Sequence, residues 1–87
     1  MTKLTNKELQ VLALIAGSNK EETLEMSQDS SEMIAKDFAE ILKMNEQQIG
    51  GIVSSLEQKG IAEIDSSNGD LNWIESGVEI YYQNLAA

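Results

Sequence analysis

The sequence predicts a small α+β domain that is mostly helical, and three observations lead to this prediction. Residues 38–62, FAEILKMNEQQIGGIVSSLEQKGIA, have the pattern of two helices joined by a tight turn and closed by a glycine. Residues 61–74 carry short apolar runs on either side of an Asn-Gly pair, which is a strong hairpin signal. Further helical patterns precede and follow these segments. This order of elements is typical of a winged helix-turn-helix domain with a two- or three-stranded β-wing.

A chain of 87 residues is long enough for one compact core, which buries about 60% of the unfolded surface at this size. We therefore expect a single winged-helix domain over residues 1–87. Apolar residues make up 41% of the chain, which favours a folded protein in spite of the formal net charge of −9. The sequence has neither an apolar run long enough for a membrane span nor a signal-peptide pattern, so the expected location is the cytoplasm.

The first helix is predicted over residues 5–17. Thr5 and Glu8 have the spacing of a capping box, in which each side chain bonds the backbone N–H of the other residue. Apolar residues follow at helical spacing up to Gly17, which is placed to end the helix in the left-handed conformation.

The acidic stretch 18–30 is predicted to connect the first and second helices. Within it, residues 23–26 fit two interpretations, which are a short first strand of the wing and part of a loop of variable length. The second helix is predicted over residues 31–43, with Asp29 and Glu32 as a second capping box. Its inward face is expected to carry Met33, Ile34, Phe38, Ile41 and Leu42.

The third helix is predicted over residues 46–58, because Asn45 and Gln48 have N-cap spacing and Gly60 follows the last periodic residue. An apolar stripe at helical spacing is expected to face inward and consists of Ile49, Ile52, Val53 and Leu56. The outward face consists of Glu46, Gln47, Gly50, Gly51, Ser54 and Ser55.

Two adjacent glycines lie in the interior of this predicted helix, at Gly50 and Gly51. Each destabilises a helix by about 1 kcal/mol relative to alanine, so both need a reason. One reason is close approach of a partner to the helix backbone. The other is relaxed packing against the first helix.

The hairpin is predicted to turn at Asn68 and Gly69 through a type I′ turn, which requires a positive φ at both residues. A last helix is predicted over residues 75–85, with apolar residues on more than one face. Because a continuous exposed apolar patch is uncommon on a small monomer, we expect a homodimer. The expected interface consists of Ile80, Tyr81 and Leu85.

Two segments resemble the MarR-like family of winged-helix regulators. Residues 38–64 resemble the family's helix-turn-helix with the Leu-Glu, Lys, Gly and apolar pair after it, and residues 73–85 resemble the segment after the wing. The resemblance implies a non-enzymatic transcription regulator that binds double-stranded DNA. The chain departs from the family because it has no counterpart of the outer dimerisation helices. Its wing also carries Asp65, Asn68 and Asp70 where the family has basic residues.

The resemblance assigns the third helix to the major groove of DNA. The amides of Gln47 and Gln48 match adenine N6 and N7, although in the other interpretation Gln48 caps Asn45 and Gln47 is only solvated. The residues expected to read the groove are Gln47, Gln48, Gly51, Ser54 and Ser55. The residues expected to hold phosphate are Lys36, Lys43 and Lys59.

The charge distribution opposes DNA binding. Six basic residues face 15 acidic ones, no arginine is present, and residues 61–87 contain acidic residues but no basic one. DNA affinity depends on neutralising phosphates, so a monomer should bind weakly or not at all at physiological salt. Replacing Asp65 and Asp70 by lysine should then strengthen binding. The alternative function is an acidic protein-protein interaction module, in one form a mimic of the charge of DNA.

Other kinds of chemistry lack their usual residues. Histidine and cysteine are absent, and no Gly-rich phosphate loop follows a strand, so nucleophilic, metal and nucleotide sites are not indicated. The stretch DSSNGD has Asp70 where a calcium loop needs glycine and Ser76 where it needs the bidentate glutamate. We therefore expect no enzymatic activity, no metal and no cofactor.

Overall fold

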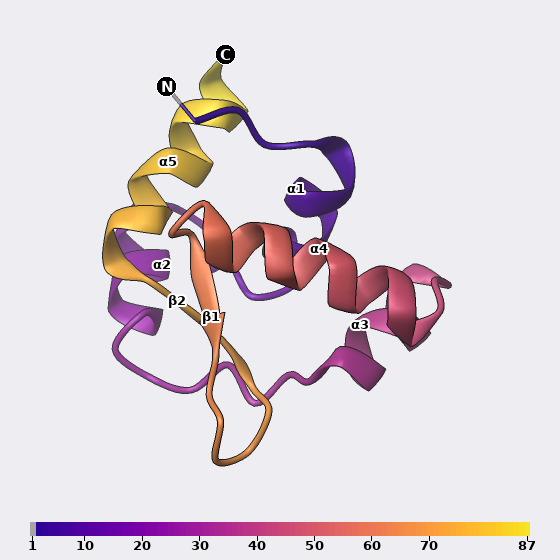
Figure 1. Cartoon of the computed structure of the whole chain (residues 1–87). Helices are drawn as coiled ribbons and strands as arrows, with labels where there is room; N and C mark the ends of the chain where they lie inside the picture. The colour runs from indigo at the N-terminus through magenta and orange to yellow at the C-terminus, as the bar shows by residue number, and fades with distance from the viewer. Residues whose placement is uncertain (1) are drawn as a thin grey trace.

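The structure is a computed structural model that describes residues 2–87 (Figure 1). Over this range it is a mostly helical α+β structure with five helices and one antiparallel sheet of two strands. None of these helices has the length and apolar character needed to cross a lipid bilayer. The elements in chain order are α1 (Asn6–Ala13), α2 (Lys20–Met26), α3 (Ala35–Leu42), α4 (Glu46–Gln58), β1 (Ala62–Ile64), β2 (Leu71–Trp73) and α5 (Glu75–Ala86).

The start of α1 confirms the predicted capping box. The Thr5 N–H donates to Glu8 Oε1 at 2.7 Å, and the Glu8 N–H donates to Thr5 Oγ1 at 3.2 Å. Both bonds satisfy N–H groups that have no partner inside a helix.

The predicted end of α1 at Gly17 is wrong, because the helix ends at Ala13 and Gly17 does not adopt a positive φ. Tertiary hydrogen bonds hold the chain beyond the helix instead. The Trp73 indole N–H donates to the Ile15 carbonyl at 2.8 Å, and the Gly17 N–H donates to Thr23 Oγ1 at 2.9 Å. These contacts compete with further helical turns and draw residues 14–17 onto the core.

Helix α2 replaces the strand or loop predicted at residues 23–26. Asn19 caps it by accepting from the Glu22 N–H at 2.8 Å, a local signal that the sequence contains. The helix packs against α5, where the fully buried Thr23 hydroxyl lies 2.8 Å from the Tyr82 hydroxyl. A helix this short is not stable in isolation, so burial of one face against α5 stabilises it.

The capping box predicted at Asp29 and Glu32 is also wrong. Helix α3 begins at Ala35, and Glu32 has a left-handed φ of 59°. The residue that bonds the entering backbone is Asp37, whose Oδ2 accepts from the Ile34 N–H at 3.0 Å.

The late start of α3 follows from the path of residues 30–34 along the sheet. The Leu71 N–H donates to the Met33 carbonyl at 2.9 Å, and the Ser31 N–H donates to Asn72 Oδ1 at 2.9 Å. These residues lie beside β2 without forming a strand. Within residues 2–87 the sheet therefore has two strands, and a three-stranded wing is not seen.

The inward face predicted for the second helix is correct only in part. Phe38 is fully buried, and Met33 and Leu42 pack partly buried against the core. Ile34 and Ile41 are exposed, Ile41 by 55%. The shift of the helix start to Ala35 leaves Ile34 outside the helix, as its N-cap residue.

Helix α4 has the predicted bounds. The Gln48 N–H donates to Asn45 Oδ1 at 2.7 Å, and Gln48 Oε1 accepts from the Asn45 N–H at 3.1 Å. After the helix, Gly60 adopts a φ of 73°, which lets the Ile61 N–H bond the Leu56 carbonyl at 3.0 Å. The chain then turns directly into β1.

Strands β1 and β2 pair in the register Ala62↔Trp73, Glu63↔Asn72 and Ile64↔Leu71. The predicted type I′ turn is wrong, because only Gly69 has a positive φ, of 80°. The connection is a wider loop in which the Gly69 N–H donates to the Asp65 carbonyl at 2.7 Å. Asn68 does not adopt the left-handed conformation. Its side chain instead stabilises the loop by accepting a hydrogen bond from the Asp70 N–H at 3.0 Å.

The start of α5 approaches the backbone after α4 without space for a side chain. The Ile74 N–H donates to the Ile61 carbonyl at 3.0 Å, and Gly77 lies buried against the same residue. The core around this contact contains Leu4, Val11, Leu12, Ile15, Phe38, Ile49, Val53, Leu56, Ile61, Ala62, Leu71, Trp73, Val78 and Tyr81.

Replacing Gly77 by alanine should destabilise the fold by about 2 kcal/mol or more, because overpacking outweighs the gain in helix propensity. The added Cβ would lie 2.2 Å from the Ile61 carbonyl oxygen. Urea denaturation followed by circular dichroism measures the change. The matched control is Gly50→Ala in α4, where nothing lies within 4 Å of the added Cβ and a stabilisation of about 1 kcal/mol is expected. Equal stability of the two variants would contradict the close approach.

Candidate recognition surface on helix α4

Helix α4 separates its buried and exposed residues as the sequence predicts, except that Ser55 is half-buried. Ile49, Val53 and Leu56 are buried, and Ile52 is half-buried. Between the exposed Glu46 and Glu57, the exposed face is uncharged and consists of Gln47, Gln48, Gly50, Gly51 and Ser54. The Asn45 cap fixes where this face begins, because it sets the first turn of the helix.

The two glycines of α4 face open space. Neither Gly50 nor Gly51 has an atom within 4 Å of the position that a Cβ would take. Packing against α1 therefore does not explain them. A surface without side chains at two adjacent positions leaves the helix backbone accessible to a partner.

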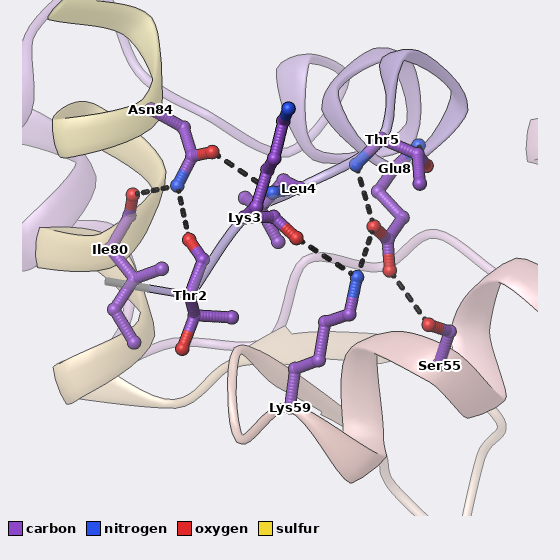
Figure 2. A network of polar contacts seen from close by, with 9 residues as sticks. All are labelled: Thr2, Lys3, Leu4, Thr5, Glu8, Ser55, Lys59, Ile80 and Asn84. Carbon is purple, nitrogen blue, oxygen red and sulfur yellow. Dashed lines mark hydrogen bonds and ion pairs between the residues drawn. The ribbon is translucent and has the colours of Figure 1, made fainter. Parts of the chain in front are cut away.

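Two residues that the sequence assigns to DNA are held by a buried carboxylate (Figure 2). Glu8 is only 2% exposed. Its Oε1 accepts from Lys59 Nζ at 2.6 Å, and its Oε2 accepts from the Ser55 hydroxyl at 2.8 Å. Lys59 Nζ also donates to the Lys3 carbonyl at 3.1 Å. Lys59 and Ser55 therefore point toward α1, and the charge of Lys59 is neutralised there.

The pKa of Glu8 reflects opposing effects. Burial raises this pKa, but hydrogen bonds from Lys59, from the Thr5 N–H and from Ser55 lower it by more, so the pKa lies below its usual range. Glu8 is therefore ionised at neutral pH. A buried carboxylate with three donors forms a local structural centre beside the exposed face of α4.

The other two candidate lysines are exposed, but acidic residues accompany them. Lys36 lines a shallow depression with Glu40 and Glu46, where α3 ends and α4 begins. Lys43 ends α3 with a left-handed φ of 57° and is also exposed. Positive charge is thus present at this end of α4 without forming a continuous patch.

A cavity of about 300 Å³ separates the first turn of α1 from α4. Lys7, which the sequence does not single out, lines this cavity together with residues of α4. Only the tertiary packing of α1 on α4 shows this proximity, so no local sequence signal predicts it. The lining residues are Thr5, Lys7, Glu8, Gln48, Gly51, Ile52 and Ser55.

No family model, curated protein or solved structure matches the chain significantly. Within residues 2–87, no group of three or more acidic, histidine or cysteine side chains is arranged to hold a metal ion.

The two aspartates of the loop between β1 and β2 have different environments. Asp65 Oδ1 accepts from the hydroxyl and the N–H of Ser67, which hold the pKa of Asp65 below its usual value. Asp70 is 8% exposed and accepts from the Ser30 hydroxyl at 2.5 Å. Asp70 thus joins the loop to Ser30, and replacing it by lysine would remove this hydrogen bond, whereas Asp65 bonds only within the loop.

The residues predicted for a dimer interface do not share one exposed surface. Tyr81 is 4% exposed and lies in the core, with its ring centroid 5.3 Å from that of Trp73. Ile80 is half-buried against the core, and Leu85 is 51% exposed. Part of the apolar character of α5 is thus explained by packing within the chain.

The N-terminal residues are also fixed on α5, through Asn84 (Figure 2). Its Oδ1 accepts from the Leu4 N–H, and its Nδ2 donates to the Thr2 carbonyl, both at 2.9 Å. These two hydrogen bonds position Lys3 so that its carbonyl accepts from Lys59 Nζ.

Replacing Glu8 by glutamine should destabilise the protein at neutral pH by about 2 kcal/mol, since charge-assisted hydrogen bonds to Lys59 are lost. The pKa of Glu8 is lowered by folding, so its contribution is present above the unfolded pKa and is lost as the pH falls through the folded one. The difference between the two proteins should therefore shrink below about pH 4.

Urea denaturation at a series of pH values measures this difference. The matched control is Glu40→Gln, which removes the same charge from an exposed position on α3. A constant difference between wild type and Glu8→Gln down to strongly acidic pH would contradict the assignment to the Glu8 carboxylate.

Proposed function

We propose that the chain is a winged helix-turn-helix domain in which α3 supports α4, α4 is the recognition helix and β1 with β2 forms the wing. Three features support this proposal. Residues 43–45 join α3 to α4 in a tight connection, α4 leads through Gly60 directly into β1, and α1 packs against both α3 and α4. The MarR-like resemblance of residues 38–64 and 73–85 agrees with this order.

We propose double-stranded DNA as the ligand of this domain and transcription regulation, without enzymatic activity, as its role. The exposed face of α4 carries the proposal, because a helix must present small and amide-bearing residues to enter the major groove closely. Gln47 offers a side-chain amide, Ser54 a hydroxyl, and Gly50 and Gly51 leave the backbone uncovered. Gln48 uses its side-chain oxygen in the N-cap, so it has less to offer a base.

The phosphate contacts in this proposal come from Lys7, Lys36 and Lys43. Lys59 is left out because its ammonium group is bound to Glu8. Three phosphate contacts give a slope of only about −2.7 for log K against log salt. Binding by one copy is therefore weak. A homodimer, with the exposed Leu85 and half-buried Ile80 as its proposed contact, would double the number of contacts.

The second candidate function is an acidic protein-protein interaction module. The observations that favour it are the neutralised Lys59 at the end of α4 and the exposed Glu40 and Glu46 near its start, in a chain with a formal charge of −9. In this function the open backbone at Gly50 and Gly51 admits a protein segment instead of DNA. The two candidates differ in their response to added positive charge.

Asp65→Lys should strengthen binding of a labelled DNA duplex and steepen its salt dependence by about one further phosphate contact, because it removes an acid from the proposed wing. It leaves the bond between Asp70 and Ser30 in place. Fluorescence anisotropy at low and physiological salt measures the binding. The control is Glu25→Lys, which makes the same charge change at an exposed position of α2, outside the proposed wing and α4. Absence of binding by both variants at low salt would favour the protein-interaction candidate.

Gly51→Ala should raise stability by about 1 kcal/mol, as expected for an unstrained helix interior, and should weaken binding to DNA by holding the duplex away from α4. Thermal melts and the same anisotropy titration measure the two effects. A gain in stability with unchanged DNA affinity would mean that close approach at α4 is not the reason for the glycine.

A further inference from the structure

A groove lies between α2 and α5, and its lining includes no residue of the core or of the exposed face of α4. It has a volume of about 530 Å³, and its lining consists of Leu24, Ile74, Glu75, Ser76 and Glu79. Leu24 and Ile74 are only partly buried and supply its apolar lining. The remaining three side chains are exposed.

The rim of the groove is acidic. Glu75 and Glu79 lie one turn apart on α5, and both line the groove. The basic residue beside them is Lys20, which forms an ion pair with Glu79. Residues 61–87 supply no further lysine or arginine.

We propose that this groove binds a basic segment of a partner protein, with an apolar side chain on Leu24 and Ile74 and flanking lysine or arginine side chains on the glutamates. Charge complementarity selects this occupant. Nucleic acid and anionic membrane surfaces are repelled by the same carboxylates. A second copy of the chain is a poor occupant. Its stretch with two lysines and no acidic residue, residues 2–7, has Leu4 buried in the core and is held on α5 by Asn84.

The position of the groove makes this interaction independent of α4. Helices α2 and α5 lie together on one side of the molecule, and the connection between α3 and α4 lies on the other (Figure 1). A partner in the groove thus leaves the exposed face of α4 free. The inference goes beyond the proposed function and does not require it.

Lys20 acts in this proposal as an internal competitor. Its ammonium group holds Glu79, and an incoming cationic side chain must replace it. Lys20→Gln should therefore strengthen binding of a basic segment. This response distinguishes the groove from a site where Lys20 is simply one of many surface charges.

The experiment titrates a labelled synthetic peptide, in which lysines flank one leucine, into the full chain at low and physiological salt. Saturable, salt-sensitive binding is expected. Glu75→Gln and Glu79→Gln should each weaken it by about two- to fivefold, in line with exposed ion pairs, and Lys20→Gln should strengthen it. The matched control is Glu40→Gln on the exposed face of α3, which should leave the affinity unchanged.

Two further peptides test the chemistry of the occupant. A peptide with serine in place of the leucine should bind more weakly, and one with glutamates in place of the lysines should not bind. Absence of saturable binding, or equal loss of affinity in Glu40→Gln and Glu75→Gln, would overturn the proposal. So would sedimentation showing a dimer that Glu75→Gln dissociates, because a second copy would then occupy the groove. The three glutamates replaced are exposed and Lys20 is half-buried outside the core, so the charge variants test the groove without disturbing the core.

Discussion

The buried carboxylate of Glu8 is the interaction on which the packing of α1 against α4 depends. It caps α1 through the Thr5 N–H, accepts from Ser55 in α4, and pairs with Lys59 at the end of α4. A carboxylate with 2% exposure would be strongly unfavourable without these donors. The first turn of one helix and the last turns of another are therefore fixed by one group. Through the Lys3 carbonyl the same network also reaches the N-terminal residues.

Local signals account for most of the fold that the sequence predicts. The capping residues at Thr5 and Asn45 set the starts of α1 and α4, because each bond spans three residues and needs no tertiary contact. Asn19 gives an equally local signal for α2, which the acidic character of the surrounding stretch obscures. The end of α1 and the start of α3 depend on Trp73 and β2, which lie far along the chain. Such ends cannot be predicted from neighbouring residues.

The candidate site shows the same division. The exposed face of α4 follows from helical periodicity, and Gln47 and Ser54 lie on it as predicted. The environments of Lys59 and Asp70 do not follow from the sequence, because their partners Glu8 and Ser30 are distant in the chain. Charge counting treats every lysine and aspartate alike. The structure separates charges that are available to a ligand from charges that are already paired within the fold.

The contact between Trp73 and the Ile15 carbonyl has a spectroscopic consequence. Trp73 is the single tryptophan of the chain, is 6% exposed and lies beside Tyr81. Its emission therefore reports the junction of α1, β2 and α5. Opening of the connection between α3 and α4, which lies away from this fluorophore, would leave the emission almost unchanged. A fluorescence unfolding curve of this protein consequently measures the persistence of its core, and partial release of α4 is visible only to probes of the backbone itself.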